Sequence, residues 1–194
     1  GNYYLTSDVS LFDSGTWHPA DNTVICLNSH NIREFAFNKP AYDVITVDSG
    51  VTFSLTECAS IQGDIHCASS AATHTVNNSG TFNLYNGRLR GTTSTADGAA
   101  VYNTGAFNMY GGTIKDNTAK NGGAFFSTTG GTIKMTGGTI SGNTATQSNN
   151  DAGGGAIYMR GNGKIDISGR AEITGNSSSL DGGAILMGWG EINI

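Results

Sequence analysis

The chain has few charged residues, few prolines and no long apolar run. Charged residues make up 13% of its 194 positions, with 10 Lys and Arg against 15 Asp and Glu. This weakly acidic balance excludes the basic face that nucleic-acid binding requires. No stretch approaches the roughly 20 apolar residues that span a bilayer, so no membrane insertion is expected. With only 2 prolines and no charged linker, the chain is predicted to form one domain.

What the sequence does contain is an internal repeat. The apolar residues Phe82, Phe107, Ile133, Ile165 and Ile192 are 25, 26, 32 and 27 residues apart. Another apolar residue follows two positions after each of them, which is the period of a β-strand. Such self-similarity is typical of a solenoid, in which each unit buries its apolar edge only against the next.

Two further apolar pieces complete each unit, one around residues 89, 114, 140 and 173 and one beginning with Gly-Ala. The 29 glycines are about twice the average usage. Corners between strands explain them, since Gly adopts positive φ freely and costs about 1 kcal/mol inside a helix. The sequence therefore predicts an all-β fold, a right-handed parallel β-helix of about seven coils. Residues 21–194 would form this helix, truncated mid-coil at the C-terminus, and residues 1–20 an N-terminal cap outside the regular stack.

The repeat also predicts which side chains lie inside. Further upstream, Phe53 and Leu55 match the first piece, and Ile25 and Leu27 match it again 28 residues earlier. For the second piece, Ile61 is expected to align with Leu89. One predicted core row holds Ile25, Leu27, Phe53, Leu55, Phe82, Leu84, Phe107, Met109, Ile133, Met135, Ile165 and Ile167, and another holds Leu89, Ile114, Ile140 and Ile173.

Polar residues recur at the corners too. Asn117, Asn143 and Asn176 occupy one repeat position and are expected to stack as an amide ladder.

The 3 cysteines leave every disulfide pairing open, as well as a reduced buried pair. Cys58 and Cys67 are closest in sequence and are the candidate disulfide. A Cys26–Cys58 bridge would join neighbouring coils, but at an offset of about four positions.

Three stretches resemble one group of proteins, the adhesin-like right-handed β-helix surface proteins of Gram-positive gut bacteria. Residues 25–32 are similar to their CLNGHTI start, and residues 44–58 to their VITV…LTDC second coil. The later Gly-Gly-Thr-Ile, Gly-Asn-Thr-Ala and Gly-Gly-Ala-Ile-Tyr units are similar to their repeats. Ser29 and Glu57 depart from the pattern, where Gly and Asp are usual. The resemblance implies an extracellular location on a bacterial cell surface, and a host glycan or a host surface or matrix protein as partner.

The Gly-Gly-Ala-Ile units also resemble the chlamydial polymorphic outer-membrane proteins. Those proteins carry repeated Phe-x-x-Asn motifs, of which only residues 35–38 fit here. This second resemblance concerns the repeat alone and implies no ligand.

Many β-helices are polysaccharide lyases or hydrolases, so we searched for acids at equivalent positions. Asp97, Asp151 and Asp181 precede the Gly-Ala pieces, with Asn121 between the first two. Asp or Asn before Gly is turn chemistry, and Ca²⁺ binding is the alternative. No outward strand carries several acids in register. We therefore predict a non-catalytic protein without a cofactor. A lyase or hydrolase with its catalytic coils elsewhere, and a purely structural stalk, are the alternatives.

The candidate ligand-binding residues are aromatic and amide side chains. Tyr85 and Tyr110 are 25 residues apart and flanked in register by Asn83 and Asn108. Exposed Tyr rings with amides beside them can hold a sugar ring, although a stabilising cross-strand pair explains the same pattern.

Residues 88, 90 and 115 could form a small basic patch, which we interpret as an ordinary solvated strand face.

Overall fold

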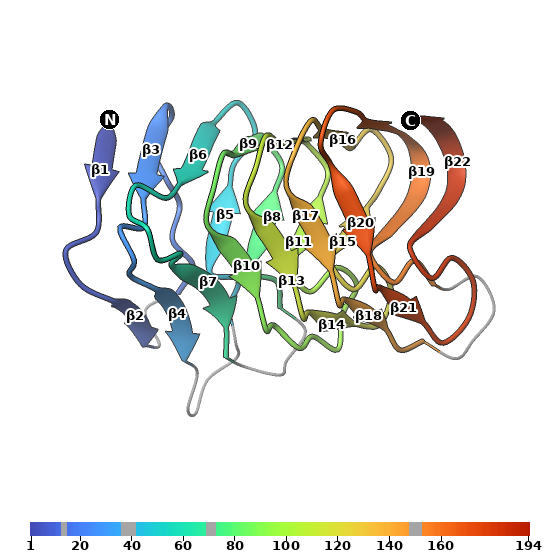
Figure 1. The fold of residues 1–194 in the computed structure, drawn as a ribbon, viewed down its shortest axis with the longest axis horizontal. Coiled ribbons are helices and arrows are strands. Elements are labelled where there is room, and N and C mark those ends of the chain that lie inside the picture. Colours follow the sequence, from blue (N-terminus) through green and yellow to red (C-terminus); the bar gives the residue numbers. More distant parts are fainter. Residues whose placement is uncertain (13–14, 36–41, 69–72, 148–152) are drawn as a thin grey trace.

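The computed structural model of the chain describes residues 1–12, 15–35, 42–68, 73–147 and 153–194. It is all-β, and its strands pair in parallel and wind into a β-solenoid of about six turns (Figure 1). The predicted parallel β-helix is therefore confirmed, with a turn count close to the expected one. Within the described ranges, no helix has the length and hydrophobicity needed to cross a membrane.

The strands form three sheets. Twelve belong to the first, whose members are β1 (Asn2–Tyr4), β3 (Thr23–Cys26), β6 (Thr52–Thr56), β9 (Thr81–Leu84), β12 (Ala106–Met109), β16 (Thr132–Met135), β19 (Ile157–Ile167), β22 (Ile185–Asn193), β15 (Phe125–Ser127), β11 (Val101–Asn103), β8 (Val76–Asn78) and β5 (Ile45–Val47). The second has seven, namely β2 (Val9–Phe12), β4 (Ile32–Phe35), β7 (Asp64–Cys67), β10 (Arg88–Arg90), β13 (Thr113–Lys115), β17 (Thr139–Ser141) and β20 (Glu172–Thr174). The third has three, namely β14 (Thr118–Ala119), β18 (Thr144–Ala145) and β21 (Ser177–Ser178).

The twelve-stranded sheet unites the first and third pieces of the repeat. Its long strand β19 pairs with β15 through residues 157–159 and with β16 through residues 164–167. The three-stranded sheet is an addition to the expected unit, because it follows the corner asparagines where only a turn was predicted. The coils that carry Asn117, Asn143 and Asn176 therefore each have a further, very short strand.

Alternation along the strands places the core as predicted. Phe53, Phe82 and Phe107 are fully buried and stack one above another, with ring centroids 5.3 and 5.1 Å apart. The other predicted core residues are buried too, except that Ile167 and Ile173 are partly buried. On the third piece, Val101, Phe125 and Ile157 pair in register and are fully buried, so this set faces inward.

The asparagine ladder is confirmed and extends further than expected. Asn117 donates from its backbone N–H and its amide to the side-chain oxygen of Asn143, at 3.1 and 2.9 Å. Asn143 repeats both bonds to Asn176 at 2.9 Å. Below Asn117, the backbone N–H of Thr92 donates to its amide oxygen at 3.1 Å, and the backbone N–H of Cys67 donates to the Thr92 hydroxyl at 3.1 Å. A polar side chain thus accepts a buried backbone N–H from the preceding coil at every step.

The first coils differ from the sequence prediction in register. Ile25 pairs with Leu55, two positions from the expected alignment. Ile61 is 70% exposed, and Ile65 takes the predicted core position beside Leu89. A shift of two residues keeps every side chain on its face of the sheet, so alternation alone does not distinguish the two registers.

Residues 1–20, expected outside the stack, contribute to it. β1 pairs with β3, β2 pairs with β4, and Trp17 bridges to Ile45. Leu5, Val9 and Leu11 pack against the buried core of the next coil. The segment therefore lies in the stack as a first coil while covering the apolar interior.

The disulfide prediction was wrong. Cys58 is bonded to Cys26 across neighbouring coils, with a Cα–Cα distance of 5.9 Å, and the third cysteine, Cys67, is buried. The register explains this result, because Cys26 pairs with Thr56 and lies two positions from Cys58 rather than four. The Cys67 thiol instead donates to the buried carboxylate of Glu34 at 3.1 Å.

Candidate functional site

The candidate site is a stacked pair of tyrosines on the twelve-stranded sheet. Leu84 and Met109 end β9 and β12 in register and point inward. Tyr85 and Tyr110 follow them by one residue and therefore point outward. Their rings are nearly parallel, with centroids 4.8 Å apart and planes 12° from each other. The side chains are 49% and 45% exposed, so part of each ring is open to solvent.

Amides lie beside the tyrosines on the same outward surface. Asn83 and Asn108 are partners in register, and the Asn108 amide donates to the Asn83 oxygen at 3.0 Å. The Asn83 amide donates in turn to the Ser54 hydroxyl at 3.3 Å. The row continues through Lys134 and Asp166 on the next coils. The structure thus brings all four predicted ligand-binding residues together as two adjacent ladders.

Two of the three acids considered for Ca²⁺ or catalysis, Asp97 and Asp181, are described, and both lie next to glycine corners. Asp97 accepts a hydrogen bond from the Asn121 amide at 2.8 Å, and the Asn121 oxygen accepts from the Gly153 N–H at 3.1 Å. Asp181 forms a bridge with Gly153, and Asp151 lies outside the described residues. Gly122 after Asn121 has φ +57°, and a Cβ there would lie 1.8 Å from the Phe125 oxygen. Asp97 and Asn121 therefore shape glycine corners, and Asp181 occupies the equivalent corner.

Only one group of three potential metal ligands lies close together in the described part of the chain. It consists of Cys26, Glu57 and Cys58, with ligand atoms within 4.8 Å of one another. Both sulfurs are in the disulfide, whereas a metal would require thiolates. The chemistry of this group is therefore structural.

Glu57 is a buried carboxylate that sequence reasoning missed. It is 8% exposed and accepts backbone hydrogen bonds from Ser29 at 3.1 Å, Ala59 at 2.9 Å and Gly63 at 2.8 Å. Burial opposes its ionisation, but these N–H donors outweigh burial and hold the pKa of Glu57 below its usual 4.5. The one signal in the sequence was an acid inside a Gly- and Ser-containing corner next to a cysteine.

We expect Glu57 to make stability depend on acid. Because its pKa is depressed in the folded state, its stabilisation is complete above about pH 4.5 and is lost as the pH falls toward the folded pKa. Urea midpoints measured from pH 7 to pH 3 should decline less steeply in Glu57→Gln than in the native chain. The exposed Glu191→Gln is the matched control, and equal slopes for all three proteins would contradict the prediction.

One stretch of the chain matches a repeat known from other proteins. Residues 137–160 match the model of the Chlamydia polymorphic membrane protein repeat. They cover β17, β18 and the start of β19, which is less than one turn of the helix. No curated protein and no solved structure matches the chain. The chain is thus a β-helix with a surface-type repeat similar to that of the chlamydial polymorphic membrane proteins.

Proposed function

We propose that this chain is a non-catalytic segment of an adhesin-like protein on a bacterial cell surface. As a rigid β-helical rod, it presents one side to a host glycan or a host surface or matrix protein. Three observations support the proposal. The helix adds about 4.8 Å of length per coil, its repeat is similar to one from polymorphic membrane proteins, and it has a disulfide, which is typical of oxidising extracellular settings.

The observation that carries the binding role is the exposed tyrosine stack. A sugar ring can place its C–H groups on the exposed part of the Tyr85 or Tyr110 ring, while Asn83 or Asn108 bonds its hydroxyls. A pair that served only to stabilise the sheet would gain more by being covered, as Phe126 and Tyr158 are at 4% and 7% exposure. Aromatic rings beside polar groups are common features of small-ligand sites.

The competing enzyme hypothesis requires carboxylates that face one substrate. Asp97 and Asp181 lie at separate corners, and Glu57 accepts backbone N–H groups. These contacts give the carboxylates of Asp97 and Glu57 a structural role, which favours the non-catalytic proposal. Ca²⁺ dependence and turnover of a polysaccharide are the two results that would favour the enzyme instead.

The experiment is a glycan-array and matrix-protein binding screen on the purified chain, with and without Ca²⁺. For any ligand found, Tyr85→Ala with Tyr110→Ala should weaken binding about tenfold, because two aromatic contacts are lost. Tyr3→Ala with Tyr4→Ala is the matched control, since both tyrosines are exposed, at 60% and 67%, on β1. Unchanged binding by the first variant would refute the site. No ligand in either screen would favour a purely structural stalk.

A further inference from the structure

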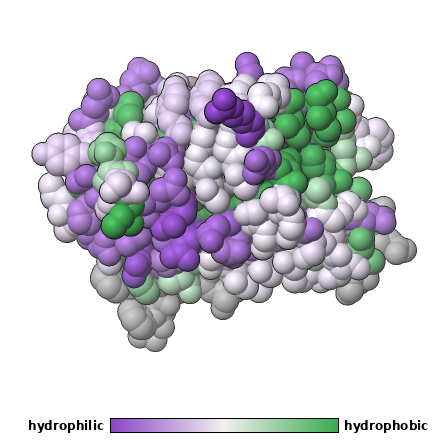
Figure 2. Space-filling view, in the orientation of Figure 1, coloured by the Kyte–Doolittle hydropathy of each residue, from purple (hydrophilic) through white to green (hydrophobic). Residues whose placement is uncertain are grey.

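An outward row of three cations and one histidine crosses the seven-stranded sheet, whereas the tyrosines follow strands of the twelve-stranded sheet. Ile32, Ile65, Leu89 and Ile114 are its buried residues on four neighbouring strands. Their chain neighbours therefore point outward. The outward row consists of Arg33 beside His66, then Arg90 and Lys115 on the next two strands. Figure 2 shows hydrophilic residues gathered over β4, β7 and β10 on this side of the molecule.

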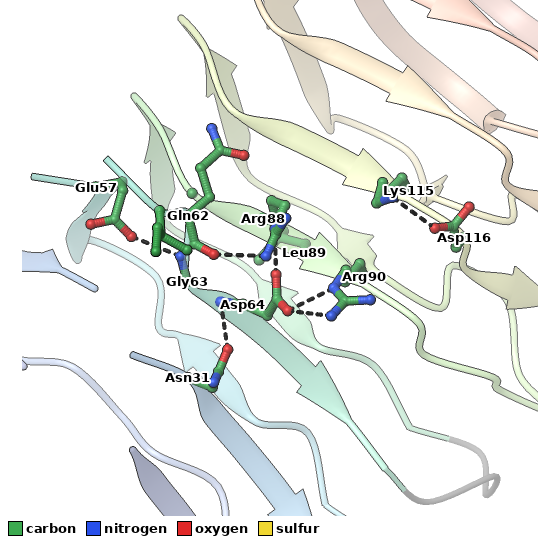
Figure 3. A network of polar contacts seen from close by, with 12 residues as sticks. Asn31, Glu57, Gln62, Gly63, Asp64, Arg88, Leu89, Arg90, Lys115 and Asp116 are labelled. Atoms are coloured by element: carbon green, nitrogen blue, oxygen red, sulfur yellow. Dashed lines mark hydrogen bonds and ion pairs between the residues drawn. The ribbon is translucent and has the colours of Figure 1, made fainter. Parts of the chain in front are cut away.

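The buried carboxylate of Asp64 binds two arginines, Arg90 within this row and Arg88 beside it. The Asp64 side chain is only 5% exposed and binds the Nε atoms of both Arg88 and Arg90, the latter at 2.6 Å (Figure 3). Arg88 also donates to the Gln62 carbonyl at 2.7 Å. The two arginine side chains remain 28% and 44% exposed, and each keeps N–H donors beyond those bonds. Asp64 therefore orients two partly exposed guanidinium groups, and some of their N–H donors stay available to a ligand.

The charge of this surface is opposite to that of the chain. Arg33, Arg88, Arg90 and Lys115, here called the basic strip, outnumber the three carboxylates beside them. Those carboxylates are Asp64, Asp116 at 3.1 Å from Lys115, and Asp8 near Arg33. The whole chain has a formal net charge of −5. Four of its 10 Lys and Arg thus lie within a set of four adjacent strands.

We propose that the basic strip binds a linear anionic polysaccharide, one with carboxylate or sulfate groups along its chain. Cations of the outward row lie on β4, β10 and β13, with His66 on β7 between the first two, so neighbouring cations are one or two coil spacings of about 4.8 Å apart. One coil spacing is close to the length of one sugar residue in an extended glycan. Arginine forks match planar or tetrahedral oxyanions with two parallel hydrogen bonds. None of the exposed large apolar side chains belongs to β4, β7, β10 or β13, whereas a protein partner would favour an apolar centre. This site goes beyond the proposed function, because its ligand class and its sheet both differ from those of the tyrosine pair.

The test uses a heparin fragment of defined length as probe, with hyaluronan as a carboxylate-only probe and dextran as a neutral one. Calorimetry at about 50 and about 200 mM NaCl gives the dissociation constant and its salt slope. Arg33→Gln with Lys115→Gln leaves the Asp64 contacts intact and should raise the dissociation constant for heparin by at least about tenfold. Arg90→Lys keeps the charge and can still pair with Asp64, so weaker binding in this variant reports the lost fork.

The matched control is Lys134→Gln with Lys164→Gln, which removes the same charge from the twelve-stranded sheet. The proposal predicts little loss of heparin binding there, and none in Tyr85→Ala with Tyr110→Ala. Equal losses in the strip and control variants would mean unspecific charge attraction and would overturn it. No binding of heparin or hyaluronan by the native chain, or equal binding of dextran, would also overturn it. The tyrosine site can fail without affecting any of these results.

Discussion

Phe107→Ala is expected to lower the free energy of unfolding by about 3–5 kcal/mol. Phe107 is fully buried and stacks on Phe82 at 5.1 Å with planes 6° apart. Its ring also meets Phe125 edge-on at 4.7 Å, so it joins the two inner rows of the twelve-stranded sheet. The coils on both sides fix the backbone spacing, so the cavity cannot collapse without breaking strand pairing.

Urea unfolding followed by far-ultraviolet circular dichroism measures the effect. Tyr110→Ala is the control, because it removes an aromatic ring three residues along the same coil, where that ring is 45% exposed. A loss below about 1 kcal/mol for Phe107→Ala would contradict the prediction. Such a result would show that neighbouring coils can move together to fill the space.

Removing the Cys26–Cys58 disulfide is expected to cost about 3–4 kcal/mol. The bond closes a loop with a sequence separation of 32 residues, and the chain-entropy treatment gives a value of this size for such a loop. The bond links the end of β3 to the corner after β6, in the adjacent coil, where the register departs from the repeat. Cys26→Ala with Cys58→Ala should therefore unfold at lower urea concentration than the native chain.

Thiol counting provides the independent check. Under denaturing, non-reducing conditions the native chain should show one reactive thiol, that of Cys67. Reductant should destabilise the native chain and leave the double variant unaffected. Three titratable thiols, or equal sensitivity of both proteins to reductant, would contradict the disulfide.

The sequence predicted the regular coils well because the same strand and corner motifs recur in them, even across the unit of 32 residues between Ile133 and Ile165. Phe82, Phe107, Ile133 and Ile165 pair in the structure in the order and register that their spacing indicated. The same spacing predicted the tyrosine stack and the asparagine ladder. Where corners keep their length, alternation and repeat position together determine which side chains meet.

The prediction failed where corner lengths vary. The corner between β6 and β7 holds Ile61. The alternation pattern fits either Ile61 or Ile65 as the core residue that aligns with Leu89. The correct signal was the polar neighbours of Ile65, since Asp64 and His66 alternate around it as residues 31 and 33 do around Ile32. The same alternation, applied to Arg88 and Arg90 around Leu89, would have indicated a shared outward row with Asp64.

Buried polar contacts were missed for a different reason. Glu57 and Asp64 look like ordinary surface acids in the sequence, but Asp64 pairs with Arg88, 24 residues away, and Glu57 accepts from Ser29, 28 residues away, as well as from its own corner. Such pairings follow from coil register, which is the quantity that the sequence left ambiguous in this half of the chain.

The asparagine ladder makes growth of the rod directional. Each ladder amide accepts an N–H from the coil before it, so the bonds of Asn117 are completed only when the coil that carries Asn143 is in place. A chain that emerges N-terminus first would therefore hold open donors at its growing end, and each new coil closes those donors and adds its own. Folding coupled in this way would proceed stepwise along the axis, with the last coil as template for the next.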